Sequence, residues 1–127
     1  MHSPTQESFG ITVEHRDESG ATVIRFLDRN LTFYVAEAVR DDVVEAVHQA
    51  RTAGDARVLL DLSEVAFIDS GGVGLVITAL NQASTINLRL GLFGVAPFLD
   101  QVFDVMRLKR HLSVFATENE ALTATAA

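Results

Sequence analysis

Cysteine is absent from the 127-residue chain, and lysine occurs only once, as Lys109. Without cysteine there is no disulfide, no thiolate nucleophile and no cysteine-ligated metal site, and the composition gives no sign of secretion. The single lysine excludes the phosphate-binding loop of nucleotide-hydrolysing enzymes, because no Gly-Lys-Ser/Thr sequence is present. The chain also lacks the run of roughly 20 apolar residues that a membrane-spanning helix needs.

Basic residues are scarce: 10 lysines and arginines are set against 17 aspartates and glutamates, which gives a formal net charge of −7. Nucleic acid and anionic membranes are bound by basic surfaces, so neither is expected as the main partner. The first ten residues contain no apolar run of the kind found in signal peptides. We therefore expect a cytoplasmic protein that neither binds nucleic acid nor inserts into a membrane.

Apolar residues make up 48% of the sequence, which is enough to fill the core of one domain. Their alternation or short continuous runs predict strands at residues 11–16, 22–27, 58–62, 67–68, 88–93 and 112–115. Spacings of three and four predict helices at residues 36–50, 73–83 and 97–107, with Val73, Val76 and Leu80 in the core. This alternation predicts an α/β fold, a mixed sheet of about four to five strands with helices packed on it.

The most unusual local sequence joins the short strand at 67–68 to the next helix. It reads Asp69-Ser70-Gly71-Gly72-Val73-Gly74. Asp69 or Ser70 is a natural N-cap, whose side-chain oxygen accepts from free backbone N–H groups. Capping does not explain three glycines within four positions, since each costs a helix about 1 kcal/mol relative to alanine. Missing side chains would let another molecule approach the backbone and would leave Ser70 projecting.

Ser70 is chemically suited to carry a phosphate. The phosphate would lie near the free N–H groups and the positive dipole end of the helix, so the modified domain need not unfold. It would add about −1.5 to −2 of charge next to Asp69. On a chain already at −7, that change would repel an acidic partner or block a packed interface.

Catalytic and metal-binding patterns are missing from the sequence. The Gly-x-Ser-x-Gly elbow of serine hydrolases does not match, because Ser70 lies between Asp69 and Gly71. The four histidines are scattered, and none pairs with a carboxylate at metal-ligand spacing. We therefore expect no enzyme, no cofactor and no metal. A small-molecule or nucleotide site that uses Gly71 to Gly74 as an anion nest stays open as the weakest alternative.

Three segments carry a resemblance to a known family. In order and spacing they resemble the signature of STAS domains, specifically the bacterial anti-sigma factor antagonists: Asp61-Leu62-Ser63, Phe67-Ile68-Asp69-Ser70 and Gly72-Val73-Gly74-Leu75. The order of the predicted elements is similar as well. The resemblance implies a STAS domain over residues 11–122, between a flexible N-terminus at 1–10 and a flexible C-terminus at 123–127.

The resemblance implies a non-enzymatic regulator in a partner-switching system. In that family, an anti-sigma factor that is also a serine kinase phosphorylates the serine directly after the loop aspartate, which is Ser70 here. The unphosphorylated antagonist binds the anti-sigma factor and releases the sigma factor; the phosphorylated form lets go, and a phosphatase resets it. By the same resemblance, the partner-binding residues are Asp69, Ser70, Gly71, Gly72, Gly74, Arg29 and Thr32.

Several positions depart from the family's pattern. Arg29 and Thr32 replace the glycine and the aspartate that usually follow the second strand. Gly71 occupies a position that is often serine, and Ala96 stands where a capping serine is frequent. The altered segment keeps an alternative open: a STAS interaction subunit of a stress-signalling or lipid-transport ATPase complex, in which the serine need not be phosphorylated.

Overall fold

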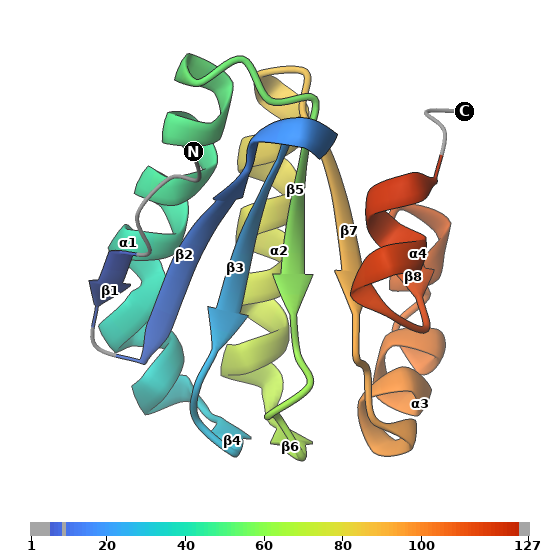
Figure 1. Cartoon of the computed structure of the whole chain (residues 1–127). Helices are drawn as coiled ribbons and strands as arrows, with labels where there is room; N and C mark the ends of the chain where they lie inside the picture. Colours follow the sequence, from blue (N-terminus) through green and yellow to red (C-terminus); the bar gives the residue numbers. More distant parts are fainter. Residues whose placement is uncertain (1–5, 9, 125–127) are drawn as a thin grey trace.

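A six-stranded sheet organises the chain in a computed structural model that describes residues 6–8 and 10–124 (Figure 1). In spatial order the strands are β1 (Gln6–Ser8), β2 (Ile11–Arg16), β3 (Ala21–Phe26), β5 (Arg57–Asp61), β7 (Arg89–Phe93) and β8 (Ser113–Phe115). A separate two-stranded sheet is formed by β4 (Asn30–Leu31) and β6 (Phe67–Ile68). The helices are α1 (Phe33–Thr52), α2 (Ser70–Thr85), α3 (Pro97–Val105) and α4 (Glu118–Thr123), with short 3-10 turns at Asp17–Ser19 and Leu108–Arg110.

The sheet is mixed, as predicted. β1, β2 and β3 pair antiparallel, whereas β3, β5, β7 and β8 pair parallel. Helices α1 and α2 lie against one face of the sheet, and α4 lies on the opposite side near β7 and β8 (Figure 1). The predicted α/β class is confirmed, and the parallel part arises because helices connect successive strands.

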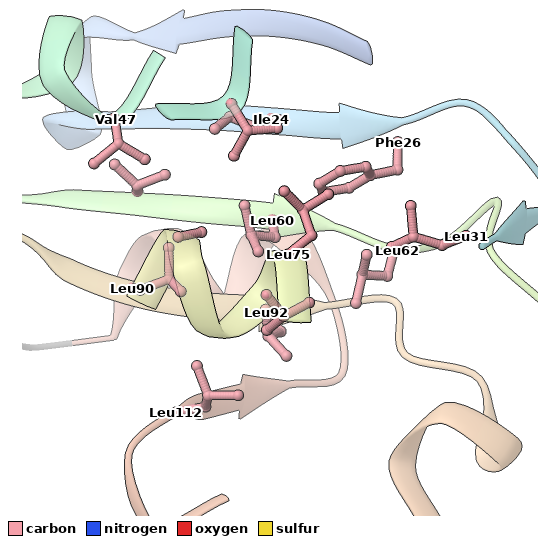
Figure 2. Close-up of a cluster of buried hydrophobic side chains, with 14 of the residues drawn as sticks. Ile24, Phe26, Leu31, Val47, Leu60, Leu62, Leu75, Leu90, Leu92 and Leu112 are labelled. Carbon is pink, nitrogen blue, oxygen red and sulfur yellow. The ribbon is translucent and has the colours of Figure 1, made fainter. Parts of the chain in front are cut away.

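The main core lies between the sheet and helices α1 and α2. Ile24, Leu60 and Leu92 project to this side from three neighbouring strands, and Leu75 of α2 lies among them (Figure 2). Of the predicted helical stripe, Val73 and Val76 are buried, and Leu80 is partly buried against the same cluster. Burial of this face fixes which side of each strand points to the helices.

The opposite face of the sheet carries a smaller apolar cluster. Val23, Leu59 and Phe93 alternate with the residues of the main core and pack with Ala121 of α4. β5 is therefore covered on both sides, which explains its nearly continuous apolar sequence.

Both ends of the chain contain more structure than expected. Within the predicted flexible N-terminus, residues 6–8 form β1, which raises the sheet from four or five strands to six. Near the other end, α4 includes Thr123, and the side chain of its N-cap Thr117 accepts from the Glu120 N–H at 3.2 Å. The helix has six residues, of which only Ala121 and Leu122 are apolar, so its sequence gives almost no amphipathic signal and we did not predict it. Residues 1–5, 9 and 125–127 lie outside the described part of the chain.

Candidate functional site

The segments that follow β3 and β5 meet at the carboxyl ends of these strands. There β4 and β6 pair in parallel (Figure 1). The Ala66 N–H donates to the Arg29 carbonyl at 2.7 Å, and the Asp69 N–H donates to the Leu31 carbonyl at 3.4 Å. Because β3 and β5 are parallel neighbours, their carboxyl ends deliver both segments to one edge of the sheet, the edge where α/β proteins commonly place their sites.

The carboxylate of Asp69 joins the starts of two helices. Its Oδ1 accepts from the Gly72 N–H of α2 at 3.0 Å, and its Oδ2 accepts from the Phe33 N–H of α1 at 3.0 Å. Asp69 is therefore the N-cap of α2, and it also satisfies the first N–H of α1, whose own N-cap Thr32 makes no side-chain capping bond. The N–H of Gly72 first, and then that of Phe33, lower the pKa of Asp69, because they stabilise its charged form.

Ser70 directly follows this fixed carboxylate. It is the first residue of α2 and is exposed. Within the part of the chain that the structure describes, its hydroxyl takes part in no hydrogen bond. The hydroxyl is therefore open to solvent without a change in internal contacts, and a negative charge there would lie at the positive end of the α2 dipole.

The three glycines near Ser70 have different environments. A Cβ on Gly71 would lie 2.5 Å from the Phe33 Cα, and one on Gly72 would collide with the Leu31 carbonyl oxygen and approach Ile68 Cγ1 to 2.6 Å. Gly71 and Gly72 thus let α2 pack against α1 and β4, a use within the chain that we had not predicted. A Cβ on Gly74 would meet nothing within 4 Å, because this glycine faces open space.

The predicted partner-binding residues gather at this one edge of the sheet. Arg29 is exposed, and its carbonyl holds the β6 segment by accepting from Ala66 and Phe67. Thr32 is half-buried at the start of α1. Gly72 is buried against Leu31 and Ile68, so it is not exposed to a partner.

Four exposed aromatic side chains flank the same edge, and we did not predict them as part of the site. Tyr34 is 83% exposed and Phe33 is 54% exposed, and their rings make an edge-on contact at 5.8 Å. Phe67 and Phe98 are 44% and 45% exposed and stack at 5.7 Å. The available signal was weak: these aromatic residues fall outside the buried helical stripes and next to polar turns.

A groove between α1 and α2 begins at the glycines. It has a volume of about 190 Å³ and is lined in part by Gly71, Gly74, Glu37 and Arg40. The fold brings Arg40 close to the glycine loop, although the two are far apart in the sequence. Glu37 lies in the same groove and opposes the positive charge of Arg40. Among residues 6–8 and 10–124, no cluster of three histidine, aspartate or glutamate side chains could hold a metal ion, and no helix is long and apolar enough to cross a bilayer.

The family model for the STAS domain matches residues 11–121, and the chain therefore belongs to the STAS domain family. This confirms the predicted family and its fold. A comparison with curated protein sequences gave no match.

Solved structures with the same fold include anti-sigma factor antagonists. A STAS domain protein of this kind from Planctomyces limnophilus is 24% identical, with a TM-score of 0.78 over 88% of this chain and 94% of its own. The phosphorylated Bacillus cell fate determinant SpoIIAA is 25% identical, with a TM-score of 0.65 over 88% of this chain and 96% of its own. The murine anion transporter Slc26a9 is 21% identical over 81% of this chain, which matches 17% of the transporter, with a TM-score of 0.62.

Gly72 and Gly74 form a matched pair for testing the packing of α2. Gly72→Ala should lower the free energy of unfolding by about 1–3 kcal/mol or more, because the new methyl collides with a backbone carbonyl. Gly74→Ala should raise it by about 0.5–1 kcal/mol, because it removes a glycine from a helix interior where there is room. Urea denaturation of the two variants measures both values; equal stabilities would contradict the described packing.

The lowered pKa of Asp69 predicts a dependence of stability on acid. Its folded-state pKa lies below the unfolded value of about 3.9, so its contribution is present above that pH and is lost as the pH falls through the folded pKa. Asp69→Asn cannot titrate, so the stability advantage of the unmodified protein over this variant should shrink from pH 5 towards pH 2.5. Urea denaturation across this range tests it, and a constant difference would refute the role of the carboxylate.

Proposed function

We propose that the protein is an anti-sigma factor antagonist that binds an anti-sigma factor with serine kinase activity and is switched off by phosphorylation of Ser70. The observation that supports this most directly is an exposed serine with an unused hydroxyl, placed directly after an aspartate that two backbone N–H groups hold in position. SpoIIAA, an anti-sigma factor antagonist solved in unphosphorylated and phosphorylated forms, shares the fold at 25% identity. The proposed role is regulatory and involves no catalysis by this chain.

The switch acts through charge and bulk at a surface that stays folded. A phosphate on Ser70 adds about −1.5 to −2 of charge beside the ionised Asp69. Because Asp69 holds the starts of both α1 and α2, the backbone under the phosphate is fixed from two sides. The positive end of the α2 dipole partly offsets the added charge. The modified surface therefore repels a partner that packed against the neutral serine, and a phosphatase restores the binding form.

The exposed aromatic side chains supply the apolar part of the proposed partner surface. Phe33 and Tyr34 lie on the α1 side of Ser70, and Phe67 with Phe98 lies on the other side. Large apolar groups concentrated around one site are typical of protein interfaces, where aromatic residues provide much of the binding energy. Asp69, Ser70, Gly71, Gly74, Arg29 and Thr32 complete this surface, and Gly72 contributes by letting α2 pack closely.

Phosphorylation is tested by incubating the protein with ATP and a purified anti-sigma factor kinase from the same organism. Mass spectrometry should show one phosphate on the unmodified protein and on Ser84→Ala, a control at an exposed serine near the other end of α2. Ser70→Ala should acquire none and should still bind the kinase. Ser70→Glu should bind at least tenfold more weakly.

Two results would refute the proposal. Phosphate transfer that persists in Ser70→Ala would show that the acceptor is another residue. Affinity capture from native lysate that recovers a stress-signalling or lipid-transport ATPase complex, with no anti-sigma factor, would establish the interaction-subunit alternative.

Tyr34 tests the aromatic surface separately from the switch. Tyr34→Ala should weaken binding of the anti-sigma factor about tenfold or more, which corresponds to about 1.4 kcal/mol. Its stability should change by no more than about 0.5 kcal/mol, because the side chain is 83% exposed. Arg51→Ala, at an exposed residue near the far end of α1, is the control and should bind normally. Calorimetric titration measures both affinities; an unchanged affinity for Tyr34→Ala would exclude this ring from the interface.

A further inference from the structure

Two arginines lie side by side at the edge of the sheet opposite to Asp69. Arg57 and Arg89 are the first residues of β5 and β7, and they are direct partners in the parallel register. They therefore lie at the amino ends of these strands, whereas Asp69 lies beyond the carboxyl ends. Like charges placed directly opposite each other on neighbouring strands repel, and an anion between two such groups is attracted by both.

The two arginines line a pocket beneath α4. The pocket has a volume of about 50 Å³, and Ser113 of β8 is its third polar side chain. Leu59, Gly91 and Phe115 form its apolar walls. This volume has room for about four water-sized groups, which matches a small anion of four or five heavy atoms.

The guanidinium group of Arg57 has hydrogen-bond partners for only some of its donors. Its Nη1 donates to the Ala121 carbonyl of α4 at 2.8 Å. Its Nε is the one buried side-chain nitrogen or oxygen among the described residues that has no hydrogen-bond partner. A buried donor without a partner costs about 1–3 kcal/mol, and such groups commonly indicate a missing water or ion.

Two further arginines on this face of the sheet form ion pairs with carboxylates. Arg16 contacts Glu14 at 3.0 Å and Glu118 at 2.9 Å. Arg25 contacts Glu64 at 3.1 Å. Arg57, by contrast, has no carboxylate within 4 Å among the described residues, although the chain has 17 acidic side chains. Its Nη1 donates to a carbonyl, and the residue lines the pocket.

We propose that this pocket binds a small oxyanion, phosphate or a short carboxylate, through the guanidinium groups of Arg57 and Arg89 and the hydroxyl of Ser113. Planar guanidinium groups present parallel N–H donors that match two oxygens of such an anion. Apolar walls strengthen these bonds by excluding water. The bound anion accepts from the Nε of Arg57, which has no partner among the described residues, and links β5, β7 and β8 to α4. This site is separate from Ser70 and does not depend on the proposed phosphorylation.

The test is an NMR titration of the full-length protein at pH 7 with sodium phosphate and, separately, sodium acetate, at ionic strength held constant with sodium chloride. The amide signals of Gly91, Ser113 and Ala121 should shift saturably with at least one of the two anions. A response to phosphate alone assigns a tetrahedral oxyanion, and a response to acetate assigns a carboxylate. Responses that do not exceed those of the chloride control, or that occur at Gly71 and Gly74 instead, would overturn the proposal.

Variants identify the residues that hold the anion. Arg89→Gln and Ser113→Ala should raise the dissociation constant at least tenfold and severalfold, respectively. Arg51→Gln, the same change at an exposed arginine near the end of α1, should leave it within twofold. Arg57→Gln should abolish binding, but it also removes the bond to α4, so its thermal unfolding is measured alongside. Undiminished binding by a folded Arg89→Gln would overturn the assignment.

Discussion

One carboxylate holds the functional edge of this protein together. Asp69 accepts from the first turn of α2 and from the first residue of α1, and the whole of β5 lies between these two helices in the sequence. Two helices that start from different strands are thereby fixed relative to one another at the point where both chain segments leave the sheet. The exposure of Ser70, the close approach of Gly71 to α1 and the placement of Phe33 at the surface all follow from this junction. The backbone beside Ser70 is thereby held from two sides.

The two edges of the sheet have different chemistry. At the carboxyl ends of the strands, an ionised aspartate, an exposed serine and aromatic rings form a surface suited to a protein partner. At the amino ends, paired arginines and a serine line a pocket with room for a small anion. The parallel strands keep the two sites on opposite sides of a common core, so a substitution at one edge need not alter contacts at the other.

The sequence was informative where the physical signal is local. Helical spacing predicted the buried stripe of α2, and the Asp-Ser pair before a helix predicted an N-cap, which the structure assigns to Asp69. The signal was insufficient where the cause is a contact between distant segments. Nothing near Phe33 indicates that its N–H bonds a carboxylate 36 positions away, and nothing near Gly72 indicates that Leu31 occupies the space beside it. β1 and α4 were missed for a related reason, since a short edge strand and a six-residue helix depend on docking more than on their own pattern.

The stacking of Phe67 on Phe98 ties helix α3 to the β6 segment. Helix α3 starts without a side-chain cap at Ala96. Its exposed Phe98 stacks on Phe67 of β6, and its buried Leu99 and Phe103 hold the helix against the core. Residues on the outer side of α3 can therefore be exchanged while the ring pair and the anchors keep the helix in place. The surface beside Phe67 can then diverge on α3 while the geometry around Asp69 stays the same, so that domains of this fold can differ in surface and share one core.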